Sequence, residues 1–423
     1  MRIVLASLIA LLPTSAGAGG FLVSKIGGDS AGPAAATPAA IFWNPGALGL
    51  LDGTHLYFDA NLFYRDARYV RASGGRYGGQ AHQSGVDAQP TLAAVSDLGL
   101  RDWTFGVGVY APFGSGSVWD DPHGPQRYHG IYGGIRGIYV TPTAVWTPIA
   151  GLHLGLGLSY VRASVTSYRA LDLGAEIAGR TGGDVPLEQP GNEGRALLDF
   201  AGNAFAWTAG LAWQRDDWTL GVSYSSSVDI DLPGTLSIYV PRNDFFMGLT
   251  GGDVSTPATF AATWPSALRL GAMWQVAPRW TLSASSEIVS WSQYDDVRID
   301  AKREVPGLGD VDQVKMMGYA DTFGLRLGVR WQWRPTLAFF GGLGGETSAV
   351  PESHLDPSLF DAPKGGAALG FSWALAEHVT WTSSYNHLAY LPVTVRHSEM
   401  SPDPAGVHSQ QVGILNANVN VHF

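Results

Sequence analysis

Apolar and polar residues alternate with a period of two along most of the chain after residue 53. In residues 152–161, leucine or tyrosine stands at every even position, with histidine, glycine, serine or valine between them. Residues 103–110, 268–275 and 324–333 repeat this arrangement. Such alternation predicts β-strands with large apolar side chains on one face and small or polar ones on the other. We count fourteen segments of this kind, so the sequence predicts an all-β fold.

The links between these segments alternate between short and long. The short links lie at residues 99–102, 147–151, 214–217, 276–279, 334–336 and 375–378. The long links lie at residues 70–88, 113–131, 171–195, 239–263, 300–319, 350–365 and 398–409. Bacterial outer-membrane barrels have short periplasmic turns and long extracellular loops. We therefore expect residues 53–423 to form a 14-stranded antiparallel outer-membrane β-barrel whose long loops are extracellular.

Tryptophan placement and the C-terminus point to the same architecture. Ten of the 15 tryptophans lie within a few residues of a short link: Trp103, Trp146, Trp213, Trp218, Trp274, Trp280, Trp331, Trp333, Trp373 and Trp381. Tryptophan is enriched at the level of the lipid headgroups, so this clustering predicts an aromatic girdle at one rim. The last segment alternates apolar residues with asparagine and histidine and ends in Phe423. This ending resembles the terminal signal of outer-membrane barrels, which implies the barrel-assembly machinery as a partner.

The N-terminus carries a targeting segment followed by a segment without strand character. Met1 and Arg2 precede an apolar run from Ile3 to Leu12, and residues 16–18 form an A-x-A site. This pattern is typical of a secretory signal peptide, which we assign to residues 1–18. Residues 19–52 are rich in glycine, alanine and proline and show no clean period. We expect them to form a hatch (plug) inside the barrel.

Composition removes several classes of function. Only 15% of the residues are charged, the net charge is −10 and cysteine is absent. An acidic chain without a basic patch is a poor partner for nucleic acid, and the lack of cysteine excludes disulfides and cysteine-based zinc sites. Residues 28–32 match G-x-S-x-G but lack the strand–turn–helix context that a hydrolase needs. We predict no catalytic residue, no metal site and no cofactor.

Several short motifs resemble the long-chain fatty acid transporter (FadL-type) family. Residues 39–46, Ala-Ala-Ile-Phe-Trp-Asn-Pro-Gly, resemble the hatch of that family. Further similar segments are Arg127-Tyr128-His129, residues 141–146, 154–158 and 291–295, Asp321-Thr322 and Val350-Pro351. The resemblance implies a plugged 14-stranded barrel that takes up hydrophobic molecules through a sideways opening at a kink in the third strand. The family has Asn-Pro-Ala where this chain has Asn44, Pro45 and Gly46.

The third strand carries residues that disturb pairing. These are Gly106, Gly108, Pro112 and Gly114. Proline cannot donate a backbone hydrogen bond and glycine lets a strand bend. We predict a kink between Val107 and Gly114 that opens the wall beside Asn44–Gly46. In the hatch, Phe42, Asn44, Pro45 and Gly46 are the expected gating residues. The resemblance also implies that Phe21, near the free end of the mature chain, reaches toward the ligand.

One long loop is unusually apolar. It contains Phe245, Phe246, Met247, Leu249 and Phe260. Exposed apolar patches often mark binding sites, so we expect these residues to capture ligand. The alternative is that the long loops simply pack on one another.

Four charged residues point into the lumen by alternation: Arg269, Arg326, Arg330 and Glu287. They form either an internal ladder of paired charges or, for Arg326 or Arg330, a partner for a ligand carboxylate. Arg162 resembles a basic position that lies near the ligand head in the family. Simple alternation turns Arg162 outward, so this role requires a β-bulge.

These observations predict passive uptake of hydrophobic compounds across the outer membrane, with long-chain fatty acids as the first expectation. Aromatic or aliphatic hydrocarbons are the alternative substrates. A structural or adhesive surface barrel and an outer-membrane lipid hydrolase are alternatives of a different class. The expected surroundings and partners are membrane lipid, lipopolysaccharide and a hydrophobic ligand.

Overall fold

The computed structural model of the protein describes residues 25–72, 78–181 and 188–423. The segment predicted as a signal peptide, residues 1–18, and Phe21 lie outside these residues. Residues 19–24 of the predicted hatch and residues 73–77 and 182–187 of the predicted barrel also lie outside them, whereas the other candidate site residues lie within them.

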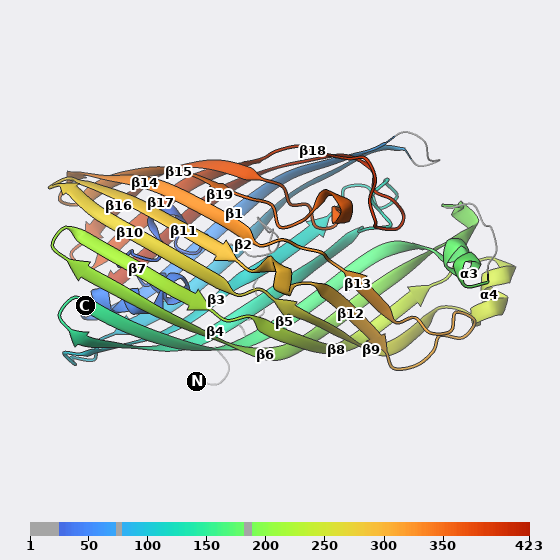
Figure 1. The fold of residues 1–423 in the computed structure, drawn as a ribbon, viewed down its shortest axis with the longest axis horizontal. Helices are drawn as coiled ribbons and strands as arrows, with labels where there is room; N and C mark the ends of the chain where they lie inside the picture. The colour runs from blue at the N-terminus through green and yellow to red at the C-terminus, as the bar shows by residue number, and fades with distance from the viewer. Residues whose placement is uncertain (1–24, 73–77, 182–187) are drawn as a thin grey trace.

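A single antiparallel sheet closes on itself, because β1 (Thr54–Arg71) pairs with both β2 (Gly79–Ser96) and the C-terminal β19 (Gly406–His422) (Figure 1). The next strands are β3 (Trp103–Val118), β4 (Tyr132–Ile149), β5 (Leu152–Asp172) and β6 (Glu193–Arg215). Two later strands are also continuous, β15 (Leu337–Glu346) and β16 (Lys364–Ala376).

The other strands are each interrupted once. They are β7 (Trp218–Ser225) with β8 (Val228–Tyr239), β9 (Val254–Trp264) with β10 (Ala267–Ala277), β11 (Trp280–Val289) with β12 (Asp296–Ala301), β13 (Gln313–Met316) with β14 (Thr322–Arg334), and β17 (Val379–Tyr390) with β18 (Val393–Val395). The nineteen hydrogen-bonded segments of the described chain thus make fourteen barrel strands. The predicted fold class is confirmed.

Short turns gather at one end of the barrel and long loops at the other (Figure 1). Thr54 and Phe423 exchange backbone hydrogen bonds of 3.1 and 2.9 Å at the short-turn end. Several of the predicted girdle tryptophans are exposed there, including Trp218 and Trp274, whose rings stack 5.0 Å apart on neighbouring strands. Half-exposed aromatic rings at one rim are typical of a membrane interface.

Most long loops are shorter than the sequence predicts, since the strands continue beyond the expected limits. β2 begins at Gly79, and β3 runs to Val118, where the alternation predicts loops. A transmembrane β-strand needs only about 9–11 residues. Beyond the lipid the outward face need not be apolar, so the alternation fades although the backbone pairing persists.

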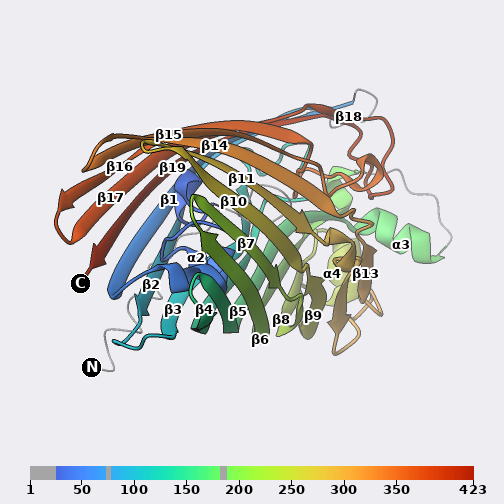
Figure 2. The same cartoon turned by 60° about the vertical axis from the view of Figure 1, so that its left-hand side comes forward.

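Short helical elements occupy the interior and the long-loop end. The 3₁₀ turn η1 (Gly28–Ser30), the helix α2 (Ala40–Trp43) and the 3₁₀ turn η2 (Pro45–Leu50) lie inside the barrel (Figure 2). Those nearer the long-loop end are α3 (Leu173–Thr181), η3 (Pro190–Asn192), α4 (Asp244–Thr250), η4 (Trp291–Gln293) and η5 (Glu352–His354). No helix in the described part of the chain is long and apolar enough to span a membrane.

Candidate functional site

The segment formed by residues 25–52, which we call the hatch, is attached to the wall through Asn44. The Asn44 side-chain amide donates to the carbonyl oxygens of Pro33, 2.7 Å away, and Leu211 of β6, 2.9 Å away. Its oxygen accepts from the backbone N–H of Gly46 at 3.0 Å and so caps η2. Asn44 is fully buried. One side chain therefore joins two parts of the hatch to each other and to the barrel.

The hatch lies against a different part of the wall than the sequence predicts. A β-carbon placed on Gly46 would come within 2.9 Å of the carbonyl oxygens of Gly210 in β6 and His153 in β5. Asn44–Gly46 thus lie against β5 and β6, and the prediction that they lie beside the third strand is wrong. Ile41 takes that place, because its side chain lies directly over Gly108 of β3.

Pairing between β2 and β3 stops halfway along the strands. Among the described residues they pair only from Leu92–Val109 to Ser96–Phe105. On its other edge β3 remains hydrogen-bonded to β4, with a register shift between Tyr110 and Phe113 that contains Pro112. The seam closes again further up, where the Asp120 N–H donates to the His82 carbonyl at 3.1 Å. We call the interval between residues 83–91 of β2 and 110–118 of β3 the unpaired seam.

Two of the predicted kink residues lie in the paired part of β3 and two lie inside the unpaired seam. Gly106 and Gly108 belong to the part of β3 that pairs with β2. Pro112 lies within the register shift, and Gly114 lies in the stretch that pairs only with β4. The break in pairing therefore begins within the predicted interval, after Val109, and continues beyond Gly114 to Val118.

Buried aromatic rings lead from the hatch to the unpaired seam. Ring centroids of Phe42 and Tyr110 are 5.8 Å apart, and Tyr110 stacks on Tyr139 at 5.7 Å. Phe113 lies 6.2 Å from Tyr139 and 4.9 Å from Trp264. We call these five residues the aromatic cluster. It provides an apolar surface inside the wall at the point where β3 loses its partner β2.

The lumenal arginines are engaged with the hatch and with acidic side chains. Arg269 Nε lies 2.6 Å from a carboxylate oxygen of Glu287, and its guanidinium lies 4.5 Å from the centre of the Phe42 ring. The Arg326 guanidinium lies 4.5 Å from the centre of the Trp43 ring. The paired ladder predicted from alternation is present for Arg269 and Glu287, and the cation–π contacts extend it to the hatch.

A cavity of about 470 Å³ that carries several charged side chains lies between the hatch and the wall from β10 to β19. Its charged lining residues are Lys25, Asp29, Glu287, Arg326, Arg330, Glu346 and Lys364. Arg330 faces this cavity and not the aromatic cluster. The lumen therefore has an apolar side near β3 and a charged side near β14.

Arg162 does not lie in the lumen. Residues 152–172 of β5 pair with β6 without a register shift, so the bulge that Arg162 requires is absent. The Arg162 side chain is exposed on the outer face and donates to Asn203 at 3.0 Å. Its predicted role as a partner of a lumenal carboxylate is wrong.

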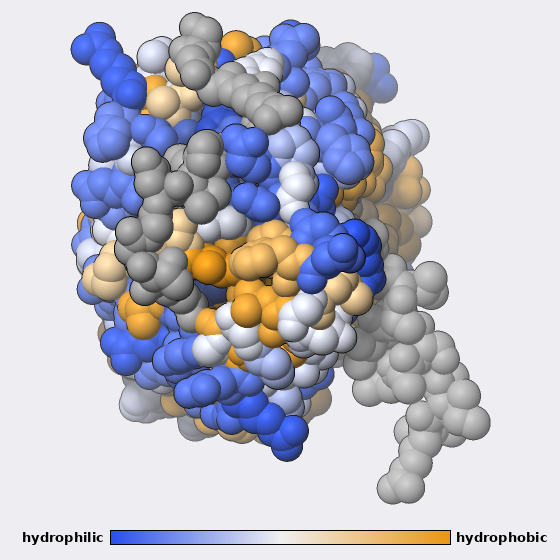
Figure 3. All heavy atoms as spheres, turned by 90° about the vertical axis from the view of Figure 1, so that its right-hand side faces the viewer, coloured by the Kyte–Doolittle hydropathy of each residue, from blue (hydrophilic) through white to orange (hydrophobic). Residues whose placement is uncertain are grey.

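The apolar loop residues divide into exposed and buried groups. On α4, Phe245 is 62% exposed and Met247 is 37% exposed, whereas Phe246 is only 1% exposed. Leu249 is half-buried. Phe260 is buried in β9 with its ring 5.8 Å from Phe200, so its predicted place on a capture loop is wrong. Apolar side chains nevertheless gather at the long-loop end (Figure 3).

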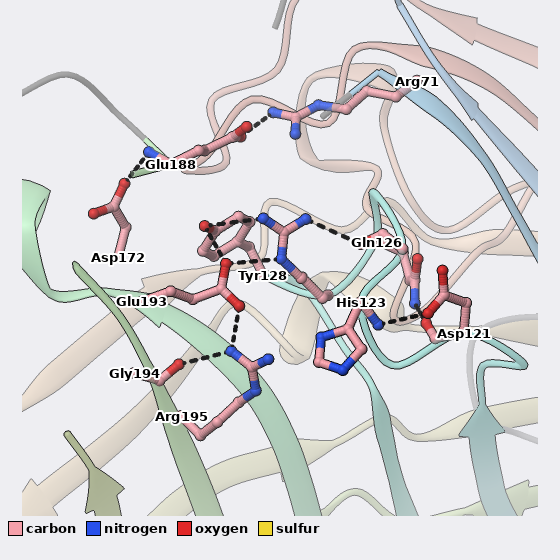
Figure 4. Close-up of polar contacts among 12 residues, drawn as sticks. Arg71, Asp121, His123, Gln126, Tyr128, Asp172, Glu188, Glu193, Gly194 and Arg195 are labelled. Atoms are coloured by element: carbon pink, nitrogen blue, oxygen red, sulfur yellow. Dashed lines mark hydrogen bonds and ion pairs between the residues drawn. The ribbon is translucent and has the colours of Figure 1, made fainter. Parts of the chain in front are cut away.

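Ion pairs tie the loops together at the same end (Figure 4). The Glu193 carboxylate accepts hydrogen bonds from Arg127 Nε at 2.9 Å and from the Tyr128 hydroxyl at 2.8 Å. It also forms an ion pair with Arg195. Burial and the Glu193 carboxylate raise the pKa of the Tyr128 phenol. These contacts brace the mouth of the barrel. Among the described residues, no group of three or more His, Cys, Asp or Glu is placed to hold a metal ion.

Sequence reasoning missed the aromatic cluster and two polar residues beside the unpaired seam, Arg65 and Gln89. The sequence does contain a feature that indicates interrupted pairing in this part of the sheet. Pro90, Pro112 and Pro142 fall inside three consecutive strands, and proline inside a strand removes a ladder hydrogen bond.

Comparisons with known proteins agree with this architecture. The model of a family described as "Outer membrane protein transport protein (OMPP1/FadL/TodX)" matches residues 9–423. The long-chain fatty acid transport protein of Escherichia coli (strain K12) is 24% identical over 415 residues, which cover 88% of this chain and 87% of the relative. The protein of the same name from Salmonella typhi is 23% identical over 399 residues, covering 88% and 87%.

Solved structures share the fold at low sequence identity. A Pseudomonas aeruginosa FadL homologue superimposes with a TM-score of 0.83 at 19% identity, covering 96% of this chain and 100% of the homologue. The Pseudomonas putida toluene transporter TodX gives a TM-score of 0.68 at 18% identity, covering 97% and 98%.

Proposed function

Because the chain belongs to the outer-membrane protein transport family that includes FadL and TodX, we propose that it takes up long-chain fatty acids by passive movement through the barrel. The family is one of outer-membrane transporters of hydrophobic compounds. The choice of fatty acids is supported by the names of the curated relatives, which are 23–24% identical over most of the chain.

The observation that carries this proposal is the aromatic cluster beside the unpaired seam. Phe113 belongs to both, since it lies on the part of β3 without β2 and contacts Trp264 at 4.9 Å. A hydrophobic solute on this surface has an apolar lumen on one side and the membrane on the other. A sideways exit keeps its tail out of water, and each buried CH₂ contributes about 0.8 kcal/mol.

Before the sideways exit, the hydrophobic solute is captured at the long-loop end. Phe245 and Met247 present apolar surface there, and the short-turn end is periplasmic in barrels of this kind. The hatch, fastened through Asn44, closes the straight route to the periplasm. Phe42 and the Asn44–Gly46 turn are the residues through which we propose that it gates the lumen.

Neutral hydrocarbons are the second candidate, and the position of the arginines favours them. Arg269 is paired with Glu287, and Arg330 faces the charged cavity. Arg269 does contact the Phe42 ring of the aromatic cluster, but its guanidinium is already paired with the Glu287 carboxylate. If fatty acids are carried, we propose that their carboxylate meets Arg326, which is the candidate that contacts the hatch.

Uptake of labelled oleate and labelled toluene tests the proposal. Cells with and without the protein are compared for the initial rate of entry of each compound. Faster entry of oleate supports the main proposal, and faster entry of toluene alone supports the second candidate. If neither compound enters faster, the transport proposal is wrong and a structural or adhesive barrel takes its place.

A further inference from the structure

Two side chains cross the unpaired seam and replace backbone bonds that the sheet lacks there. Gln89 of β2 donates its side-chain amide to the carbonyl oxygen of Ala111 in β3. Arg65 of β1 donates Nη1 to the carbonyl oxygen of Gly116 in β3, 2.8 Å away. Gln89 is 1% and Arg65 is 6% exposed, so both bonds are shielded from water.

The bond from Gln89 repairs a defect that proline creates. The β2–β3 register runs from Ser96–Phe105 to Leu92–Val109. Continued by two residues, it would place Ala111 opposite Pro90. Proline has no N–H to donate, and an unpaired buried carbonyl is costly. The amide of the preceding residue, Gln89, supplies the missing donor.

The bond from Arg65 spans the width of β2, because Arg65 lies on β1 and its acceptor Gly116 lies on β3. Arg65 is paired in the β1–β2 register with Gly85, and a β-carbon on Gly85 would meet no atom within 4 Å. The space beside Gly85 is therefore open, and no side chain at this position separates Arg65 from Gly116. Asp87 of β2 interacts electrostatically with Arg65 and with Arg136 of β4, which adds charge attraction between the two edges.

The contrast with an ordinary ladder matters for movement. Backbone bonds on paired strands break only when the strands separate. Bonds from a side chain break when that side chain changes rotamer, while both strands stay attached to β1 and β4. The unpaired seam is thus held by contacts that can open without unfolding the wall.

We propose that Arg65 and Gln89 form a two-point latch across the unpaired seam and set the width of solute that can leave the lumen sideways. This inference rests on the proposed transport function and names residues that control its exit step. A slim solute passes with one latch bond displaced, and a wide one requires both bonds to open.

Uptake of solutes of different width tests the latch. Initial rates for labelled toluene and labelled pyrene are compared in wild type, Arg65→Ala, Gln89→Ala and the double variant. Removing one bond should raise the pyrene-to-toluene ratio by about fivefold, the factor that one net hydrogen bond contributes to an equilibrium. Arg65→Lys, which keeps a donor, should return the ratio toward wild type.

Matched controls separate the latch from general effects on the barrel. Arg68→Ala and Gln411→Ala alter exposed side chains on β1 and β19, and they should leave the ratio unchanged. Heat-modifiable migration on gels identifies folded barrels for every variant. If Arg65→Ala and Gln89→Ala fold and change both rates by the same factor, the latch proposal is wrong.

A cross-link tests the exit directly, because the chain has no native cysteine. Gln89→Cys with Ala111→Cys, bridged by a reducible bifunctional thiol reagent, should reduce uptake to the level of cells without the protein. Reduction should restore it. The control is Ala94→Cys with Val107→Cys, which lie opposite each other where β2 and β3 are paired. A bridge between these two positions should not block uptake.

The outcomes distinguish this proposal from the general one. If wild type carries neither toluene nor oleate, the proposed function fails. If wild type carries solute and the bridged Gln89–Ala111 protein does so at the same rate, transport stands and the latch is overturned.

Discussion

The side-chain amide of Asn44 and the backbone carbonyl of Leu211 lie 2.9 Å apart, although 167 residues separate them in the chain. This bond fastens the hatch to β6. Asn44 also holds Pro33 and caps η2, so its removal leaves several buried backbone groups without a partner.

Asn44→Ala should therefore loosen the hatch more than the barrel. We expect a loss of about 3 kcal/mol of stability, since a lost cap costs about 1 kcal/mol and each unsatisfied buried group about 1–3 kcal/mol. Limited proteolysis of the folded barrel should cut the variant within residues 25–52 at a higher rate. Asn203→Ala is the control, because the Asn203 side chain is exposed and accepts its hydrogen bond from the exposed Arg162. Equal cleavage of the two variants would contradict the assigned role of Asn44.

The buried pair of Arg269 and Glu287 makes a second prediction. Arg269→Ala leaves the Glu287 carboxylate without its partner at 2.6 Å and should cost about 3–5 kcal/mol, as for other broken buried pairs. Replacing both residues, Arg269→Met with Glu287→Leu, should recover most of this loss. Thermal unfolding in detergent measures each variant. Arg330→Ala, which alters a side chain that lines the cavity, is the control and should change stability by less than about 1 kcal/mol.

Replacing the two adjacent phenylalanines on α4 should affect different properties, stability for Phe246 and ligand uptake for Phe245. Phe246 is buried, so Phe246→Ala should destabilise the loop by about 3–4 kcal/mol. Phe245 is exposed, so Phe245→Ala should leave stability within about 0.5 kcal/mol and lower the initial rate of oleate uptake at low concentration. Hydrogen exchange of α4 and uptake together distinguish them. An unchanged rate for Phe245→Ala would exclude it from ligand capture.

Loop packing at the long-loop end should weaken in acid. Burial lowers the pKa of His129 to about 4. The negative charge of Asp356 raises this pKa, whereas the positive charges of Lys315 and Arg169 lower it. The unfolded chain, with a histidine pKa near 6.5, binds more protons between these values, so stability rises with pH. We expect the free energy of unfolding to fall by about 2 kcal/mol from pH 7 to pH 4. This is less than the full pKa difference implies, because His129 is only half-buried.

Thermal unfolding or loop hydrogen exchange at pH 4.5 and 7.5 measures this loss. His129→Gln should reduce the difference between the two pH values. His123→Gln, at an exposed position in the same loop, should leave it unchanged. An undiminished difference in His129→Gln would show that other groups cause the acid sensitivity.

The strand number and the tryptophan girdle could be predicted from the sequence because both depend on local order. Alternation decides which face of a strand is apolar, and turn spacing decides where strands end. The outward position of Arg162 follows from the same rule, since β5 continues without a bulge. Loop lengths were less predictable, because alternation fades outside the lipid although pairing continues.

Tertiary structure decided where distant segments meet. The hatch turn at Asn44–Gly46 lies on β5 and β6 instead of the third strand, and Phe260 turns into the core. Arg65 reaches Gly116 and Gln89 reaches Ala111 only because closure of the barrel sets the register of β1, β2 and β3. Local alternation specifies the face of each residue, but contacts across strands depend on register, strand ends and the position of the hatch, and these are determined only when the whole sheet has closed.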